Sequence, residues 1–381
     1  MKTWVSTLLA LLAGYLIYNT WFATDETEEP TVDAPRILEV APPDGGTSDG
    51  TDAEAAADRD QDQPRRSFDL DSKPVGPAAT QESVADRAAA DLDKKRHAAI
   101  ENGNDKRAAQ LAQQILSEYP ETRAAGWVNF EFGREHYHAY QSLGRTKAGL
   151  ERAKEAWKYW TKALLFARAD GAEKDELRAR LDKLAKDLLF TSRHIEGIDR
   201  MHTPRRGDTL EVLCKKTFRN YGARTSPGFV AAVNGMRSPK DLRAREPIRV
   251  PLGTLSIRVV KHEFRLYVLL DDCYVRSFGV GLGRQGGTPV TTFVVGGMNK
   301  NPDWYPKPGL KIPFGDSRNI LGTRWIGFRN TPEHRGFGIH GTSDPSSIGR
   351  EESSGCVRML NREVEILFDW LTPGTKIAVV R

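Results

Sequence analysis

A histidine and a cysteine that together could carry out acyl transfer lie in one polar stretch, residues 339–359, which reads IHGTSDPSSIGREESSGCVRM. His340 precedes Cys356 by sixteen positions. A neutral thiol attacks a carbonyl poorly, and a neighbouring imidazole can remove its proton. Gly355 lets a substrate approach the backbone closely and suits a sharp turn, whose N–H groups could hold an oxyanion. The stretch therefore predicts a nucleophile and its base.

A structural interpretation competes with the catalytic one. A lone cysteine is most often a buried core thiol, and a lone histidine is most often a hydrogen-bonded structural residue. The segment between His340 and Cys356 is rich in glycine and serine, whereas a core cysteine more often lies in an apolar run. The spacing of the two residues does not by itself decide between the interpretations.

The same stretch resembles the active-site signature of the L,D-transpeptidase catalytic domain, the YkuD-like family, which combines His-Gly-Thr, a Ser-Ile-Gly loop and Ser-x-Gly-Cys-Ile/Val-Arg. Residues 301–304 and the strand at 288–293 are also similar to the family. Thr291 replaces that strand's usual glycine, and Ser354 stands where many members carry a histidine, which weakens any role for a second histidine. The resemblance covers roughly residues 255–381. The matching residues are His340, Gly341, Thr342, Ser347, Ile348, Gly349, Ser353, Gly355, Cys356, Val357 and Arg358.

The resemblance implies a peptidoglycan L,D-transpeptidase that acts on tetrapeptide stems. The Cys356 thiolate would attack the carbonyl of the third residue, expel D-Ala and leave a thioester. An amine of another stem would resolve the thioester as a 3→3 cross-link, or water would hydrolyse it. His340 would act as the base toward Cys356 and then as the acid toward the leaving amine. The resemblance implies neither a metal nor a cofactor.

The remaining site residues follow from the same resemblance. In the family a backbone carbonyl orients the histidine, and the matching candidates are Gly341 and Ser353, between which the sequence does not choose. Backbone N–H groups near Gly355 and Cys356 would form the oxyanion site. Arg358 would either meet a substrate carboxylate or brace the loop.

Two other functions stay open. In the first, the protein is a non-catalytic wall-binding anchor whose C-terminal domain has degenerated, which the departures at Thr291 and Ser354 support. In the second, the domain is a thiol hydrolase that acts on some other amide.

The beginning of the chain predicts a membrane anchor followed by a flexible tether. Residues 4–23 form an uncharged, mostly apolar stretch long enough to span a bilayer, and acidic residues follow. We expect residues 1–23 to be an uncleaved anchor in the inner membrane rather than a cleaved signal, with the catalytic domain on the outer, periplasmic or wall side. Residues 24–83 are acidic, with 15 acids against 5 bases up to residue 80, and predict a disordered linker.

The rest of the chain is basic, because the whole protein has a net charge of +5 despite its acidic linker. A basic body could meet an anionic wall polymer or phospholipid, but a solvated surface is the favoured interpretation, and we do not expect a nucleic-acid partner. The 3 cysteines are too few for a disulfide framework, although a bridge between Cys214 and Cys273 stays open.

Residues 84–198 show helical periodicity. Ala108, Leu111, Ala112 and Ile115 recur at helical spacing. The paired helices loosely resemble tetratricopeptide repeats, without a clear 34-residue period. A protein partner is the expected ligand of this region.

Residues 203–252 resemble a LysM module, a small βααβ unit that binds glycans containing N-acetylglucosamine. Arg206-Gly207-Asp208-Thr209-Leu210 opens the pattern, and Asn234 and the Ile-Arg-Val-Pro run at 248–251 follow. The resemblance makes Asp208, Thr209 and Asn234 candidate glycan ligands. The alternative is that Asp208 or Thr209 is only a helix N-cap.

Residues 255–381 alternate short apolar runs with glycine-rich turns, which predicts a mainly-β domain. We therefore expect a multidomain protein: a membrane helix, an all-α region, a βααβ module and a mainly-β catalytic domain.

Overall fold

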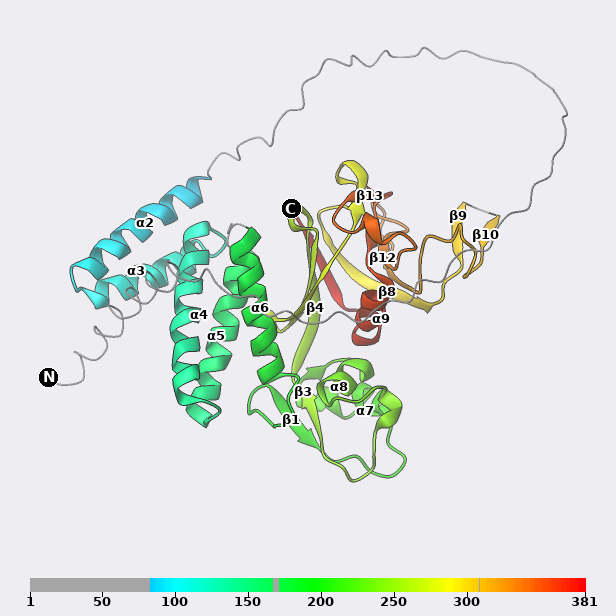
Figure 1. The fold of residues 1–381 in the computed structure, drawn as a ribbon, viewed down its shortest axis with the longest axis horizontal. Coiled ribbons are helices and arrows are strands. Elements are labelled where there is room, and N and C mark those ends of the chain that lie inside the picture. The colour runs from blue at the N-terminus through cyan, green and yellow to red at the C-terminus, as the bar shows by residue number, and fades with distance from the viewer. Residues whose placement is uncertain (1–82, 167–170, 308) are drawn as a thin grey trace, which may run out of the picture. The chain divides into compact units, whose positions relative to one another are not determined.

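The structure is a computed structural model that describes residues 83–166, 171–307 and 309–381 (Figure 1). The predicted anchor, residues 1–23, lies outside the described residues, as does all of the predicted linker except residue 83. Among the residues that are described, no helix is both long and apolar enough to cross a membrane.

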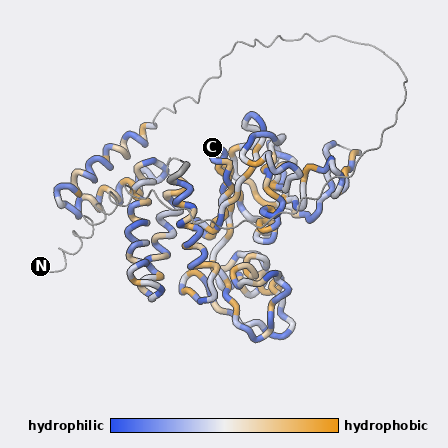
Figure 2. The backbone as a smooth tube through the Cα atoms, in the orientation of Figure 1, coloured by the Kyte–Doolittle hydropathy of each residue, from blue (hydrophilic) through white to orange (hydrophobic). Residues whose placement is uncertain are grey.

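The helical region predicted for the middle of the chain is confirmed. Side-chain oxygens of Ser83, Asn104 and Thr122 accept hydrogen bonds from backbone N–H groups in the first turns of their helices, where such donors lack helical partners. Apolar residues recur in bands between hydrophilic ones along these helices (Figure 2). The helices are α2 (Val84–Glu101), α3 (Asp105–Glu118), α4 (Arg123–Leu143), α5 (Lys147–Phe166) and α6 (Gly171–Leu188).

A small βααβ unit follows, as predicted, although its first strand begins before residue 203. Strand β1 pairs antiparallel with β3, and α7 and α8 lie between them in the chain. The unit encloses its own apolar core, which includes Leu210, Phe218 and Val230. Its membership of the LysM family stays a prediction. The elements are β1 (Asp199–His202), α7 (Leu210–Lys215), β2 (Ala223–Arg224), α8 (Pro227–Val233) and β3 (Ile248–Pro251).

The C-terminal part is mainly β, which confirms that part of the predicted fold. One sheet has the strand order β14-β12-β11-β8-β15-β4-β5-β6, and β2 also pairs with β4. Helix α9 (Asn361–Trp370) contacts β11 and β12. The strands are β4 (Gly253–Val260), β5 (Arg265–Leu270), β6 (Cys273–Gly279), β7 (Leu282–Gly283), β8 (Thr292–Lys300), β9 (Trp304–Lys307), β10 (Leu310–Ile312), β11 (Arg324–Phe328), β12 (Gly338–His340), β13 (Glu351–Ser353), β14 (Val357–Arg358) and β15 (Lys376–Val380).

Helix α5 covers the edge strand of this sheet. Its Trp157 donates an indole hydrogen bond of 2.6 Å to the carbonyl oxygen of Tyr274 in β6, and the Thr161 hydroxyl accepts one of 2.9 Å from the Tyr274 N–H. Both side chains are buried. An uncovered edge would leave such backbone groups without partners, so part of the helical region is integral to the catalytic sheet.

A buried arginine joins the βααβ unit to the end of α6. The Arg249 guanidinium in β3 donates to the carbonyl oxygens of Leu188 (3.0 Å) and Leu189 (2.6 Å) and to the Asp199 carboxylate (2.9 Å from Nε). Asp199 also meets the His194 imidazole at 2.5 Å. Since the last carbonyls of a helix lack helical partners, Arg249 caps α6 from a distant strand.

Candidate active site

Strands β12 and β14 bring the two ends of the polar stretch together. They pair in parallel, with Ile339 opposite Val357 and His340 opposite Arg358. Ile339 and Val357 are fully buried in the core, and side chains alternate between faces along a strand. His340 and Arg358 therefore lie on the opposite face. The sheet register places the predicted base in β12 and the predicted nucleophile, Cys356, immediately before the neighbouring strand β14.

The imidazole of His340 is held in one orientation. It is 2% exposed and stacks on Trp325, with ring centroids 5.9 Å apart. Its Nδ1 lies 2.6 Å from the carbonyl oxygen of Gly341. Because a carbonyl only accepts hydrogen bonds, Nδ1 carries the proton, and Nε2 of the neutral ring keeps a free lone pair.

The electrostatic surroundings keep His340 neutral. Its pKa is lowered to about 4, chiefly by burial and also by the positive charge of Arg358, while the hydrogen bond to Gly341 opposes both effects. The pKa lies well below neutral pH, so the resting imidazole is a base rather than an acid.

Of the two carbonyls that could orient His340, that of Gly341 does so. Ser353 instead organises the turn before the nucleophile. Its hydroxyl donates 2.6 Å to the carbonyl oxygen of Cys356 and accepts 3.1 Å from the N–H of Gly355. Ser353 is 3% exposed, so it satisfies two groups of the turn away from water.

Gly355 occupies a position that only glycine fits. Its φ is +132°, and a Cβ there would lie 2.7 Å from the ring of Phe337 and 2.9 Å from the carbonyl oxygen of Gly287. Both the backbone conformation and the contacts exclude a larger residue. This explains the glycine that the sequence places before the predicted nucleophile.

Cys356 is a protonated thiol at rest. Burial raises its pKa, and the backbone hydrogen bond from Gly338 and the charge of Arg358 oppose this rise without cancelling it. Its Sγ lies 3.7 Å from the carbonyl oxygen of Gly336. The resting site therefore pairs a neutral thiol with a neutral imidazole.

The other two cysteines are also free thiols, so the bridge between Cys214 and Cys273 that the sequence left open is absent. Burial raises the pKa of each to about 12. At Cys214 the charge of Glu211 adds to the rise in pKa that burial causes. At Cys356 the hydrogen bond from Gly338 and the charge of Arg358 oppose that rise in pKa.

Sequence reasoning missed two residues of the site. Trp325, opposite His340 in the register of β11 and β12, provides the stacking surface. Asn361 begins α9, five positions after Cys356, and contacts the loop that follows His340. Neither carries a chemical signal in the sequence, because both act through packing and position.

The three candidate glycan ligands have roles within the βααβ unit itself. Thr209 is the N-cap of α7, so the capping alternative applies to it. Asp208 accepts 2.6 Å from the N–H of Arg205. Both ends of the Asn234 amide bind the backbone of Arg249 in β3, at 2.7 and 2.8 Å. These bonds leave little of Asn234 for a sugar, and glycan binding by the unit stays a prediction.

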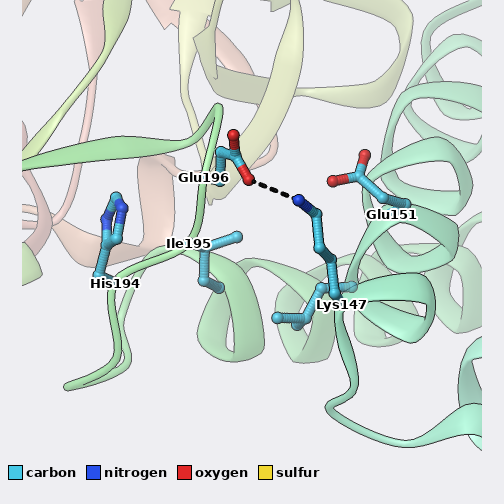
Figure 3. Close-up of a pocket in the computed structure, with 6 residues that line it drawn as sticks. Lys147, Glu151, His194, Ile195 and Glu196 are labelled. Atoms are coloured by element: carbon cyan, nitrogen blue, oxygen red, sulfur yellow. Dashed lines mark ion pairs between the residues drawn. The ribbon is translucent and has the colours of Figure 1, made fainter.

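A cavity of about 430 Å³ lies elsewhere, between the start of α5 and the segment before β1 (Figure 3). Leu150 and Ile195 contribute apolar lining, and Lys147 forms a 3.2 Å ion pair with Glu196. None of the residues of the candidate active site lines it. Across the part of the chain that the structure describes, no group of three or more His, Cys, Asp or Glu residues could hold a metal ion.

A mainly-β domain with a neutral, oriented imidazole in one strand and a free thiol just before the paired strand is a candidate acyl-transfer domain. Residues 255–379 match the family model of the L,D-transpeptidase catalytic domain, called YkuD. The putative L,D-transpeptidase YqjB of Bacillus subtilis is 37% identical over 129 residues, which cover 33% of this chain and 72% of the relative. The chain therefore belongs to the L,D-transpeptidase family, whose members are acyltransferases.

Further relatives differ in how much of their length is matched. The putative L,D-transpeptidase YkuD of Bacillus licheniformis is 29% identical, with 47% of this chain and 98% of the relative covered. The probable L,D-transpeptidase YcfS of Escherichia coli is 27% identical, with 46% and 59% covered. A crystal structure of an L,D-transpeptidase from Mycobacterium tuberculosis is 12% identical over 37% of this chain and 75% of that chain, at a TM-score of 0.29, which supports no conclusion by itself. The family match does not reach residues 203–252.

Proposed function

We propose that this protein is a peptidoglycan L,D-transpeptidase whose nucleophile is Cys356. The thiol sulfur attacks the carbonyl of the third residue of a tetrapeptide stem, a C–S bond forms, and D-Ala leaves as the C–N bond breaks. An amine of a second stem, or water, then releases the acyl group. One observation supports this most directly: the neutral His340, whose Nε2 carries no proton, lies in β12, and Cys356 immediately precedes β14, the strand paired with β12.

The thiol loses its proton during the attack rather than before it. Because both groups are neutral at rest, the thiol proton passes to Nε2 of His340 as the C–S bond forms. The hydrogen bond from Nδ1 to Gly341 strengthens as the ring becomes charged. Burial makes the imidazolium a strong acid, so it readily returns the proton to the leaving amine.

The oxyanion and the substrate carboxylate have separate candidate partners. The N–H of Gly355 already donates to Ser353, so we assign the oxyanion to the N–H of Cys356 and the turn around it. Arg358 lies on the same face and is partly exposed, which suits it to a substrate carboxylate. Its charge also favours the thiolate during attack.

Incubation of the full chain with a disaccharide-tetrapeptide tests the proposal. D-Ala release and cross-linked dimers are expected from the wild type, and neither from Cys356→Ala. Cys273→Ala removes another free, largely buried thiol and is the matched control, expected to keep activity. A carbapenem should add covalently to Cys356 alone, as seen by mass spectrometry. Full activity of Cys356→Ala would refute the nucleophile assignment.

Three further measurements distinguish the remaining alternatives. Binding to insoluble peptidoglycan without turnover would favour the non-catalytic anchor, and turnover of unrelated amides in a substrate panel would favour a general thiol hydrolase. Muropeptides from cells with and without the protein would separate cross-linking from carboxypeptidase activity. The oriented, neutral His340 and the free thiol of Cys356 favour the transpeptidase.

We also propose that the flanking regions hold the enzyme at the wall. Residues 4–23 would anchor it in the inner membrane with the catalytic domain on the outer side, residues 203–252 would bind glycan, and α2 to α4 would bind a protein partner. Sedimentation of the full chain and of a variant lacking residues 203–252 with insoluble peptidoglycan tests the second role. Fractionation of membranes from cells that express the chain with and without residues 4–23 tests the first.

A further inference from the structure

The side chain of Asn361 joins two loops beside the candidate base. Its Nδ2 donates 3.0 Å to the carbonyl oxygen of Thr342, and its Oδ1 accepts 3.2 Å from the N–H of Thr323. A carbonyl requires a donor and an N–H requires an acceptor, so the two partners fix which end of the amide points to which loop. An isosteric carboxylate could satisfy only one of them.

Two glycines make room for this amide. A Cβ on Gly341 would lie 2.1 Å from Oδ1 of Asn361, and a Cβ on Gly322 would lie 2.2 Å from the same atom. Both loops therefore pack their backbone directly against the amide. One of these two glycines is the residue whose carbonyl accepts the proton of His340 Nδ1 at 2.6 Å.

The contacts of Asn361 are not those of a helix cap. It is the first residue of α9, after the N-cap Leu360, which makes no side-chain capping bond. The amide of Asn361 reaches to the loops at Thr323 and Thr342 instead. A residue with only a helix-starting role would not need both an N–H and a carbonyl from separate loops.

We propose that Asn361 is a positioning residue that sets the orientation and tautomer of His340. Its hydrogen bond holds the peptide between Thr342 and Ser343, and its Oδ1 packs against Gly341, whose carbonyl in the preceding peptide holds Nδ1–H. Asn361 does not touch the reacting atoms. This inference rests on the proposed function, since it concerns the base of that reaction.

The test measures the tautomer of His340 in the full chain, purified in detergent and labelled with ¹⁵N-histidine. His340→Gln assigns the signal. In the wild type, Nδ1 should be protonated and Nε2 should not. Asn361→Asp keeps the acceptor for Thr323 and sets a carboxylate oxygen against the carbonyl of Thr342. We expect a mixture of the two His340 tautomers. Acylation by a carbapenem should be about tenfold slower, with little change in the apparent affinity for the carbapenem, because the loss of one hydrogen bond corresponds to about a tenfold change in rate.

Asn319→Asp is the matched control. The Asn319 amide also bridges backbone groups, donating to the carbonyls of Pro302 (3.0 Å) and Ile312 (3.2 Å) and accepting from the N–H of Leu321 (3.0 Å), but it has no contact with Gly341. Its replacement should lower the melting temperature and leave the signals of His340 unchanged. Asn361→Ser, which adds no charge, is the second variant if Asn361→Asp does not fold.

The outcomes separate this inference from the proposed function. If the wild type is acylated and the His340 tautomer is unchanged in a folded Asn361 variant, the positioning role is refuted. The same conclusion follows if Asn319→Asp disturbs the tautomer equally, since the effect would then be one of general stability. A wild type that no carbapenem acylates contradicts the proposed function, whereas the tautomer still reports on Asn361.

Discussion

The low pKa of His340 predicts that acylation persists in acid where an ordinary histidine would be protonated. With its pKa at about 4, His340 stays neutral down to nearly that pH. A base with a pKa of about 6.5 would be about 90% protonated at pH 5.5, and its reaction would slow about tenfold relative to pH 7 or above. We expect the second-order rate of acylation of Cys356 by a carbapenem to change less than twofold, by the same titration arithmetic, between pH 5.5 and pH 7.

The same group sets part of the pH dependence of stability. The folded pKa lies below the unfolded value of about 6.5, so the unfolded chain binds the proton first as the pH falls. The contribution of the buried neutral His340 to the free energy of unfolding is fully present above about pH 6.5 and is lost progressively as the pH falls toward about 4. The difference of roughly 2.5 units corresponds to about 3 kcal/mol of unfolding free energy.

Urea unfolding of the wild type and of His340→Gln at pH 7, 5.5 and 4.5 measures this loss. As the pH falls, the wild type should lose more of its free energy of unfolding than the variant does. This extra loss should approach about 3 kcal/mol at the lowest pH. His138→Gln, at an exposed histidine of α4, is the control and should follow the wild type. Parallel curves for wild type and His340→Gln, or a tenfold fall in acylation by pH 5.5, would refute the neutral buried base.

Three substitutions test the supports of the site. Arg249→Met should lower the free energy of unfolding by about 3–5 kcal/mol, because it removes the guanidinium from the buried Asp199 carboxylate and from the carbonyls at the end of α6. Trp157→Phe should cost about 1–3 kcal/mol, because the buried carbonyl of Tyr274 in the edge strand loses its donor. Gly355→Ala should slow acylation of the thiol about 10- to 100-fold, because its φ of +132° strains any side chain. Denaturant titrations measure the first two, and carbapenem kinetics measure the third.

Two of these substitutions, Arg249→Met and Gly355→Ala, have a control in the chain. Arg243→Met removes an exposed arginine of the same βααβ unit, whose ion pair with Glu246 spans 3.5 Å, and should change stability by less than about 0.5 kcal/mol. If Arg249→Met lowered the free energy of unfolding by as little as Arg243→Met, the stabilising role of Arg249 at Asp199 and α6 would be contradicted. Gly349→Ala, at a positive φ with open space around it, controls for backbone strain outside the nucleophile turn. Equal slowing by both glycine variants would contradict a specific role for the turn.

The candidate nucleophile and base could be named from the sequence because the chemistry limits the choice of residue. A thiol, an imidazole and a glycine at the turn leave a pattern in one stretch, and the β alternation after residue 255 predicts the kind of domain. The sequence could not choose between the Gly341 and Ser353 carbonyls. That choice depends on which carbonyl the folded loop turns toward Nδ1.

Long-range packing explains what the sequence could not reveal. Arg249 looks like one more exposed cation in a basic chain, yet it is 1% exposed and caps a helix that ends 61 positions earlier. Trp157 looks like one more helix packing residue, yet its indole N–H supplies a donor to a strand 117 positions later. These roles depend on where a distant backbone group lies, and no local pattern records that.

The neutral pair at the site explains why positioning matters so much in this enzyme. A preformed thiolate would react with many electrophiles, but Cys356 is protonated at rest, and in the proposed mechanism it gives up its proton only as a carbonyl is attacked. That proton transfer would require Nε2 of His340 to face the thiol at that moment, so the orientation of the ring would control the rate. The sheet register, Trp325 and the Gly341 carbonyl all act on that one ring. In the proposed reaction, selectivity for the stem carbonyl would follow from geometry rather than from a highly reactive sulfur.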